Sequence, residues 1–311
     1  MSKIPVILDC DPGHDDAIAI ILACASDKLD VKAITTVGGN QTISKTTNNA
    51  LRILTFINRD DIPVAKGADK PMRRTLEIAP EVHGDSGLDG PELPEPNKIE
   101  LDINAYELMA KVIEESKDKV TLVPTGPLTN IAIFLISYPH LHSKIEKISL
   151  MGGSAIGGNW TASAEFNILV DPEASDIVFK SGIPIVMSGL DVTHKAQIRE
   201  KEIAKIKAQG GKVAILVGEL LEFFMKFHKE IVGFDFAPLH DPCAVAYLMK
   251  PEMFKSKKLN VCIDMDGEHT VGCTVTDFNG VTGKKPNVDV LVDVDINSYV
   301  DLIIDSVNKY E

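Results

Sequence analysis

The sequence is poor in cysteine and has no cysteine pair with metal-binding spacing. Its 311 residues include five cysteines, an odd number scattered along the chain and never spaced as CxxC: Cys10, Cys24, Cys243, Cys262 and Cys273. This pattern argues against a disulfide framework and against a thiolate metal site. We expect all five to be reduced residues of the core.

The chain also lacks a block rich in lysine or arginine and a long apolar run. Its formal net charge is −13, from 45 acidic and 32 basic side chains, which disfavours binding to nucleic acids and to anionic membranes. The longest uncharged stretch, residues 120–143, is broken by prolines and a glycine, so no membrane span is expected. The first apolar run begins at Ile4, which leaves no room for a secretory signal before it, and a cytoplasmic protein is predicted.

Neither an internal repeat nor a linker-like segment divides the sequence. Short apolar runs alternate with longer helical patterns through about residue 190, which is typical of a doubly wound, mainly parallel α/β sheet. Three later alternating segments have no helices between them and suggest an antiparallel addition: residues 259–265, 273–278 and 288–294. The sequence therefore predicts one domain over residues 1–311, with a mixed Rossmann-like sheet covered by helices on both faces.

Residues 67–97 interrupt the alternation with many prolines and glycines. An irregular connection of this length is usually functional or disordered. Within it, residues 82–90 carry a histidine, two acids and three glycines, and are a candidate flap over a site or else a solvated loop. A second glycine-rich stretch, residues 152–159, lacks the ending of a P-loop, which disfavours phosphate binding there. An aromatic stripe at residues 223–227 is expected to belong to the core.

Residues 4–17 are the most unusual stretch, an apolar run that ends in acids before a second apolar run begins. Asp9, Asp11, Asp15 and Asp16 fall within eight residues. The Pro-Gly pair between the runs predicts a buried strand, a tight turn and a buried helix, so the acids lie where open α/β sheets build their sites. Adjacent helical residues point about 100° apart, which assigns different tasks to Asp15 and Asp16. One carboxylate is enough to cap a helix, whereas several crowded ones require a cation, and oxygen ligands favour Ca²⁺ or Mg²⁺.

His240 and Asp241 form a second candidate. Asp241 precedes a proline at a helix start, as Asp171 does, and an N-cap role alone explains it without any chemistry. If Asp241 instead converges on the acids near Asp11, it brings the imidazole of His240 into the same pocket. The other histidines with no metal-binding spacing are expected at the surface or satisfied in the core: His140, His142, His194, His228 and His269.

Residues 8–17, LDCDPGHDDA, match the DxDPGxDDA signature of the inosine-uridine nucleoside hydrolase family. The resemblance runs along the chain in an ordered set of short motifs: VGGN at 37–40, VHG at 82–84, PTGPLTN at 124–130, MGG at 151–153, GNW at 158–160, AEFN at 164–167, GLD at 189–191 and HDP at 240–242. His83 and His240 make the chain most similar to the bacterial pyrimidine-preferring ribonucleoside hydrolases. His14 occupies a position that the signature leaves free.

The resemblance implies the nucleoside hydrolase fold and one bound Ca²⁺. Its ligands would be Asp11, Asp16, Asp241 and the backbone carbonyl of Thr125. Asp11 would also act as general base on a calcium-bound water, with Asp9 supporting the site from behind. Such a cation supplies a template for the sugar diol and an acidified water.

The same resemblance implies the substrate contacts. Asp15 and Asn40 would hold the 2′ side of the ribose, Asp241 and Asn167 the 3′-hydroxyl, and Asn159 and Glu165 the 5′-hydroxyl. His240, with His83, would protonate or polarise the leaving base. Anionic groups under the sugar stabilise the positive charge that develops as the N-glycosidic bond breaks.

The implied activity is hydrolysis of ribonucleosides to ribose and free base, in salvage or catabolism, by a homodimer or homotetramer. Whether pyrimidine nucleosides, purine nucleosides or both are cleaved stays open. Two other classes remain. Residues 9–11 resemble the DxD motif of Mg²⁺-dependent haloacid-dehalogenase-like phosphatases, although Gly13 stands where that class has Thr or Val. A calcium-stabilised nucleoside-binding protein without turnover would use the same acidic pocket.

Overall fold

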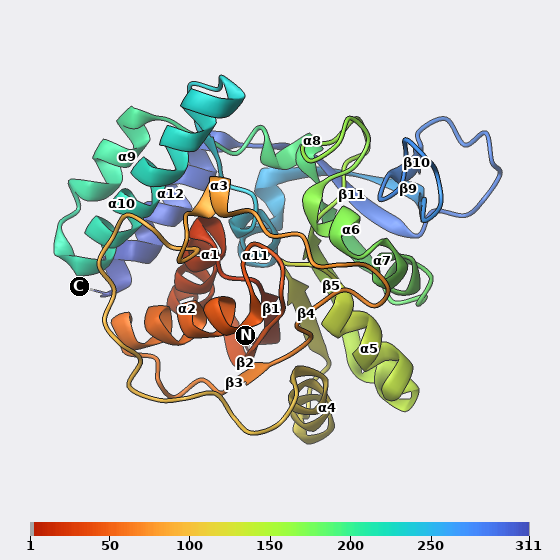
Figure 1. Ribbon diagram of the computed structural model, residues 1–311, viewed down its shortest axis with the longest axis horizontal. Coiled ribbons are helices and arrows are strands. Elements are labelled where there is room, and N and C mark those ends of the chain that lie inside the picture. The colour runs from red at the N-terminus through yellow and green to blue at the C-terminus, as the bar shows by residue number, and fades with distance from the viewer. Residues whose placement is uncertain (1–2, 311) are drawn as a thin grey trace.

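A nine-stranded sheet runs through the computed structural model, which describes residues 3–310 (Figure 1). Its strand order is β10-β9-β11-β6-β5-β4-β1-β2-β3. The strands are β1 Ile4–Cys10, β2 Leu29–Thr36, β3 Val64–Lys66, β4 Val120–Pro124, β5 Ile145–Met151, β6 Ile185–Ser188, β9 Phe254–Ile263, β10 Thr274–Asp277 and β11 Val288–Val294. β7 (Gln197–Ile198) and β8 (Ala237–Pro238) form a separate antiparallel pair.

The sheet is mixed and mostly parallel, as predicted. β3, β2, β1, β4, β5, β6 and β11 are all parallel to their neighbours in that order, whereas β9 is antiparallel to both β11 and β10. The prediction of an antiparallel addition is correct, because β9 is antiparallel to both β10 and β11. β11 connects this addition to the rest of the sheet by pairing with β6 in parallel.

Helices cover both faces of the sheet. They are α1 His14–Ala25, α2 Ile43–Phe56, α3 Pro80–His83, α4 Ala105–Glu115, α5 Thr129–Ser137, α6 Phe166–Val170, α7 Pro172–Phe179, α8 Leu190–Thr193, α9 Glu200–Lys207, α10 Gly211–Phe227, α11 Pro242–Met249 and α12 Ile296–Val307. The apolar side chains of α1, α2, α10, α11 and α12 belong to one core cluster, and those of α4, α5 and α7 to the other. Within residues 3–310, none of these helices combines the length and apolar character needed to cross a bilayer.

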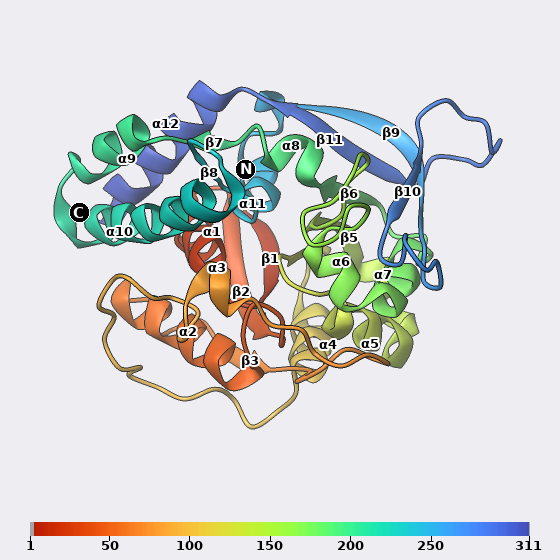
Figure 2. The same ribbon diagram turned by 45° about the horizontal axis from the view of Figure 1, so that its top comes forward.

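The burial of α1 on all sides explains why its sequence is apolar nearly all round. Every residue of this helix except Cys24 is buried, because the helix packs against the sheet, α10, α11 and α12. A helix buried on all sides has no polar face to show. Figure 2 shows α9, α10 and α12 gathered at one end of the molecule, with β9 and β10 at the opposite end.

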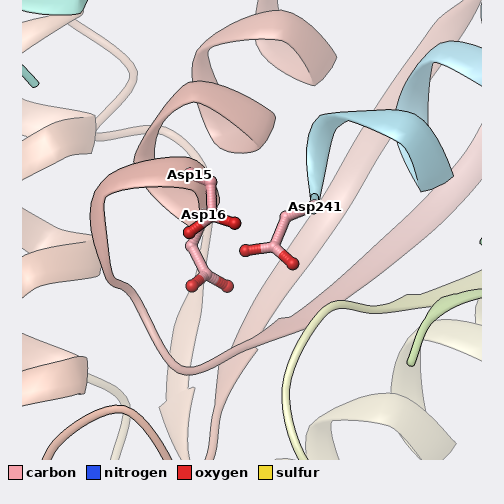
Figure 3. Close-up of side chains that lie close together, drawn as sticks. All are labelled: Asp15, Asp16 and Asp241. Carbon is pink, nitrogen blue, oxygen red and sulfur yellow. The ribbon is translucent and has the colours of Figure 1, made fainter. Parts of the chain in front are cut away.

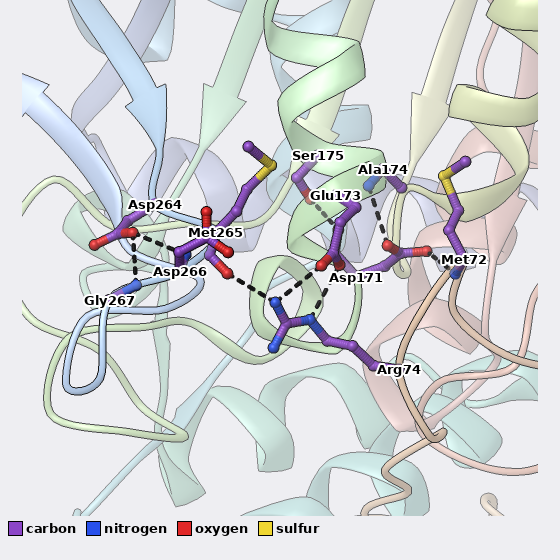
Figure 4. A network of polar contacts seen from close by, with 10 residues as sticks. All are labelled: Met72, Arg74, Asp171, Glu173, Ala174, Ser175, Asp264, Met265, Asp266 and Gly267. Carbon is purple, nitrogen blue, oxygen red and sulfur yellow. Dashed lines mark hydrogen bonds and ion pairs between the residues drawn. The ribbon is translucent and has the colours of Figure 1, made fainter.

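The irregular connection over residues 67–97 is held against the rest of the fold (Figure 4). The backbone N–H of Met72 donates to Asp171 at 2.8 Å, and the guanidinium of Arg74 donates to both carboxylate oxygens of Glu173 at 3.0 Å and to the carbonyl of Met265 at 2.8 Å. The connection also contains α3, which ends at the buried His83. For residues 82–90, a solvated loop is the wrong interpretation, because His83, Gly87 and Leu88 are buried.

The order of the strands fixes where a site can form. From β1 the chain proceeds to β2 and β3 on one side and then crosses to β4, β5 and β6 on the other. Ligand sites of open α/β sheets lie outside the carboxyl ends of the strands at such a reversal. Asp11 follows β1 and Thr125 follows β4, so both residues lie at this point.

Candidate active site

Three carboxylates converge at the reversal point (Figure 3). Asp15 and Asp16 lie in the first turn of α1, and Asp241 comes directly before α11. One oxygen of each lies within 4.8 Å of the others, and all three side chains are buried. A hard cation prefers such an all-oxygen set.

The structure corrects the cap interpretation of Asp241. Asp171 does cap α7, because its carboxylate accepts the N–H of Ala174 at 3.0 Å. Asp241 stands at the same position before a proline, yet its side chain makes no capping hydrogen bond and points toward Asp15 and Asp16 (Figure 3). The carboxylate of Asp241 is therefore available to a ligand.

Asp11 lies beside this cluster, held by the turns that follow β2 and β4. Its Oδ2 accepts the N–H of Asn40 at 2.7 Å, while its Oδ1 is buried with no hydrogen-bond partner among the described residues. A Cβ on Gly126 would lie 2.5 Å from Oδ1, and one on Gly39 would collide with Oδ2. Both turns require glycine here because the carboxylate approaches their backbones.

Thr125 joins the acids to the far side of the site. Its hydroxyl donates to Asp16 Oδ1 at 2.8 Å, and its carbonyl accepts from Asn167 Nδ2 at 2.8 Å. The predicted ligands Asp16 and Asp241 are thus within reach of one ion, Thr125 contacts Asp16, and Asp11 offers an unpaired oxygen nearby. Asp15 shares the cluster with Asp16 and Asp241 although it was predicted to hold ribose instead.

Burial and mutual repulsion make these acids costly to ionise without a cation. Burial raises the pKa of Asp15 to about 7, and the charge of Asp16 adds to the rise. Burial, with the neighbouring charges, also raises the pKa values of Asp11 and Asp241 well above the ordinary range. Since the donors are all oxygen and one of them is unpaired, the residues fit a divalent hard cation.

A cavity of about 320 Å³ opens above the cluster. Its polar end is lined by residues predicted to hold ribose: Asp15, Asn40, Asn159, Glu165, Asn167 and Asp241. Its other end is aromatic: His83, His194, Phe224, Phe227, His228, Phe234 and His240. Neither lysine nor arginine occurs among the described residues that line it, so the cavity offers no cation to a phosphate group.

The polar end is fixed by backbone contacts before any ligand arrives. Glu165 caps α6 and also accepts the N–H of Gly153 at 2.8 Å. Asn40 Nδ2 lies 3.2 Å from both the carbonyl of Asp11 and Asp16 Oδ2, and Asn159 Oδ1 accepts the N–H of Phe166 at 3.1 Å. Side chains held in this way lose little further freedom when a ligand binds.

The aromatic end contains two histidines to which the sequence interpretation assigned no role. His194 and His228 were expected at the surface or in the core, but both line the cavity. His228 follows α10, whose aromatic stripe was assigned to the core, and Phe224 and Phe227 of that stripe also line the cavity. An aromatic stripe running into a histidine is the only sequence signal that distinguished this helix from an ordinary core helix.

Burial favours the neutral form of the cavity histidines. Burial lowers the pKa of His228 to about 4, and burial lowers the pKa values of His83 and His240 well below the usual range. His240 Nδ1 lies 2.8 Å from Thr193 Oγ1, which leaves its Nε2 for the cavity. The site therefore combines an end lined by carboxyl groups with an aromatic end that offers hydrogen bonds.

The comparisons with known proteins agree with this arrangement. The family model described as inosine-uridine preferring nucleoside hydrolase matches residues 6–301. The chain belongs to this nucleoside hydrolase family. It is 57% identical over 308 residues to the pyrimidine-specific ribonucleoside hydrolase RihA of Escherichia coli (strain K12), covering 99% of each chain.

Solved nucleoside hydrolases share the fold. The structure of a purine-preferring ribonucleoside hydrolase from Gardnerella vaginalis superposes with a TM-score of 0.92 at 30% identity, covering 98% of both chains. The plant nucleoside hydrolase PpNRh1 gives a TM-score of 0.92 at 32% identity, covering 99% of both chains. The predictions of the nucleoside hydrolase fold and of an N-glycosyl hydrolase are confirmed, and the family match argues against the phosphatase alternative.

Proposed function

We propose that the protein is a calcium-dependent ribonucleoside hydrolase that prefers uridine and cytidine and releases ribose and the free base. The observation that carries this proposal is one cavity with buried carboxylates at one end and neutral histidines at the other. The 57% identity to a pyrimidine-specific RihA supports the pyrimidine preference. The resemblance of the fold to a purine-preferring enzyme keeps purine or non-specific cleavage as the alternative.

Asp11, Asp16, Asp241 and the carbonyl of Thr125 would hold the Ca²⁺. Bound there, the ion would supply a template for the ribose diol and would lower the pKa of water. Asp11, whose Oδ1 has no hydrogen-bond partner among the described residues, would take the proton of the attacking water. Asp9 lies behind this site, where its carboxylate accepts from Thr35 and Asn130, and supports the end of β1.

The sugar would lie over the polar end. Asp15 and Asn40 would bind the 2′ side of ribose, Asp241 and Asn167 the 3′-hydroxyl, and Asn159 and Glu165 the 5′-hydroxyl. The carboxylates then face the sugar where positive charge develops, and they stabilise the transition state more than the substrate. Ribose should be preferred over 2-deoxyribose because the 2′ contacts need the hydroxyl.

The base would lie among the aromatic side chains, where His240 and His83 assist its departure. A base leaves more easily when a hydrogen bond or a proton compensates its developing charge, an effect worth about 10²–10⁴ in rate. We also propose that the whole chain acts as one nucleoside hydrolase domain, since a single sheet includes strands from β1 to β11, and that it assembles as a homodimer or homotetramer.

The test uses chromatography to measure the release of sugar and base from five nucleosides: uridine, cytidine, inosine, adenosine and 2′-deoxyuridine. Hydrolysis of the pyrimidine ribonucleosides, loss of rate in EDTA and recovery with CaCl₂ are expected. Absence of sugar release from every ribonucleoside would leave a binding protein, and faster cleavage of inosine would favour the alternative. Light scattering after size-exclusion chromatography measures the oligomer.

A further inference from the structure

Thr274 begins β10, the edge strand of the sheet, and its side chain is buried against the turn that follows β5. Its hydroxyl accepts the N–H of Ser154 at 2.8 Å and donates to the carbonyl of the same residue. A hydroxyl has one hydrogen to donate and two lone pairs to accept with, so both bonds form together. Thr274 therefore binds both backbone polar groups of Ser154.

The peptide that joins Gly153 to Ser154 is held from both sides. Its N–H donates to Thr274, and its carbonyl accepts the N–H of Leu190, at the start of α8, at 2.9 Å. Gly153 has a φ of +75°, and a Cβ there would lie 2.7 Å from Cγ2 of Thr274. The turn needs glycine here, and because glycine rotates freely, contacts on the following peptide are what fix its conformation.

The N–H of Gly153 reaches the polar end of the cavity, where it donates to Glu165 Oε2 at 2.8 Å. Oε2 also accepts the N–H of Ile168 at 3.3 Å, and Oε1 accepts the N–H of Asn167 at 3.0 Å. A carboxylate has about four acceptor positions, so these three backbone donors leave one position, on Oε1. Since Glu165 lines the cavity, that position is available to a ligand hydroxyl.

The hairpin of β9 and β10 supports the segment around Glu165 at two further places. The hydroxyl of Ser163 donates to the carbonyl of His269 at 2.6 Å, and a Cβ on Gly272 would lie 2.8 Å from Cα of Leu169. The contact of Thr274 is the one that continues through hydrogen bonds to the carboxylate itself. A functional group held in this way presents its free acceptor at a fixed place.

We propose that Thr274 is a positioning residue for the 5′-hydroxyl of the nucleoside, acting by fixing the Gly153–Ser154 peptide and, through it, Glu165. The proposal rests on the proposed hydrolysis and on the proposed contact of Glu165 with the 5′-hydroxyl. The competing explanation is that Thr274 only fastens the hairpin to the turn. A fastening would matter equally for every substrate, whereas a positioning residue matters only when a 5′-hydroxyl is present.

Two substitutions at Thr274 separate the hydroxyl from the methyl group. Thr274→Val removes the hydroxyl at similar size and leaves the N–H and carbonyl of Ser154 without a partner, so the turn should relax. Thr274→Ser keeps the hydroxyl and loses the methyl group. Thr276→Val is the matched control on the same strand, because the hydroxyl of Thr276 donates to the carbonyl of Thr274 at 3.0 Å and not to the turn.

The assay compares kcat/KM for uridine with that for 5′-deoxyuridine, which lacks only the 5′-hydroxyl. Wild type should favour uridine, because binding energy from a remote hydroxyl is used at the reacting centre. Thr274→Val should lower the value for uridine about tenfold and that for 5′-deoxyuridine by less than about twofold. Thr274→Ser and Thr276→Val should keep the wild-type ratio. Adding Thr274→Val to Glu165→Gln should cause little further loss on uridine, because both changes act on one contact.

Equal loss on the two substrates in Thr274→Val, or a changed ratio in Thr274→Ser, would overturn the proposal in favour of a fastening. If Thr274→Val fails to fold, Thr274→Cys replaces it and should show the same selective loss, because a thiol is a weak donor and acceptor. Wild-type protein that cleaves neither nucleoside would refute the proposed function, and this inference with it. Wild type that cleaves both equally well would refute the inference and leave hydrolysis standing.

Discussion

Replacing Asp15 by Asn should stabilise the calcium-free protein while abolishing hydrolysis. Burial raises the pKa of this carboxyl from 3.8 to about 7, with the charge of Asp16 as the next cause. Since the folded pKa is the higher one, the unfolded chain loses its proton first, and ionisation costs stability as the pH rises from about 4 to about 7. At 1.36 kcal/mol per pKa unit, the cost is about 4 kcal/mol at pH 7.5 and about 1 kcal/mol at pH 4.5.

Asparagine cannot ionise and avoids this cost. A chain of 311 residues has an unfolding entropy of about 0.65 kcal/mol/K, so 4 kcal/mol corresponds to a rise in Tm of about 6 °C. The variant should therefore melt about 6 °C above wild type at pH 7.5 in EDTA, and about 1 to 2 °C above it at pH 4.5. Thermal unfolding followed by circular dichroism measures both differences.

The comparison removes the titrating histidines from the result, whereas the loss of the Asp15 charge also relieves Asp11 and Asp241, whose pKa values it raises, and so acts in the same direction as the loss of Asp15 itself. Burial lowers the pKa values of His14 and His228 to about 4, so these histidines cost stability as the pH falls below about 6.5, opposite in sign to Asp15. They are present in both proteins and cancel in the difference. The control Asp171→Asn loses the cap of α7 and should melt lower than wild type. An Asp15→Asn variant no more stable than wild type at pH 7.5, or equally shifted at both pH values, would refute the reasoning.

Three further changes test neighbouring parts of the site. Asp241→Asn should remove the rise in Tm that CaCl₂ produces over EDTA, measured by differential scanning fluorimetry, because a ligand is lost. Gly126→Ala should displace Asp11 and lower kcat/KM for uridine about 10²-fold. Uridine hydrolysis measures this effect, and a normal rate in the variant would contradict the prediction. His228→Leu should raise KM for uridine about tenfold and leave KM for 4-nitrophenyl β-D-ribofuranoside unchanged, because the leaving group of the latter has no N–H. Nδ1 of His228 donates to the carbonyl of Phe224, so its Nε2 is left to accept from the N–H of uracil.

The sheet and its helices could be predicted because their signals are local. Strands such as β1 and β5 are short apolar runs, and α2 shows a regular apolar face. The direction of β11 could not be predicted, because it depends on which strand it pairs with across the sheet. The short helices α6 and α8 were not predicted either, because elements of four or five residues have no measurable periodicity.

The acidic end of the site could be anticipated, whereas much of the aromatic end could not. Asp11, Asp15 and Asp16 are neighbours in sequence and at a strand end, so their meeting follows from local structure. The role of Asp241 was ambiguous, because the same sequence pattern, an acid before a proline, occurs when the acid caps a helix, as Asp171 does, and when it faces a ligand. Only the three-dimensional contacts distinguish the two.

His194 and His228 received no individual role because single histidines carry no pattern. Their place in the cavity depends on the packing of α10 and of the turn after β6, which brings residues far apart in sequence to one wall. A buried histidine in such a wall must be neutral to avoid an unpaired charge, and the lowered pKa of His228 agrees. The same neutrality suits a wall that binds a planar base through hydrogen bonds.

The stretch of acids near the N-terminus serves both ends of the cavity. Its carboxylates lie at the acidic end, while Gly13 makes room for His83 and His14 contacts the same ring at the aromatic end. The start of α1 thus contacts both the groups expected to hold the sugar and a histidine expected to assist departure of the base. A change at Gly13 should therefore affect both ends of the cavity, because its N–H donates to Asp16 Oδ2 at 3.0 Å while a Cβ there would lie 2.6 Å from Nδ1 of His83.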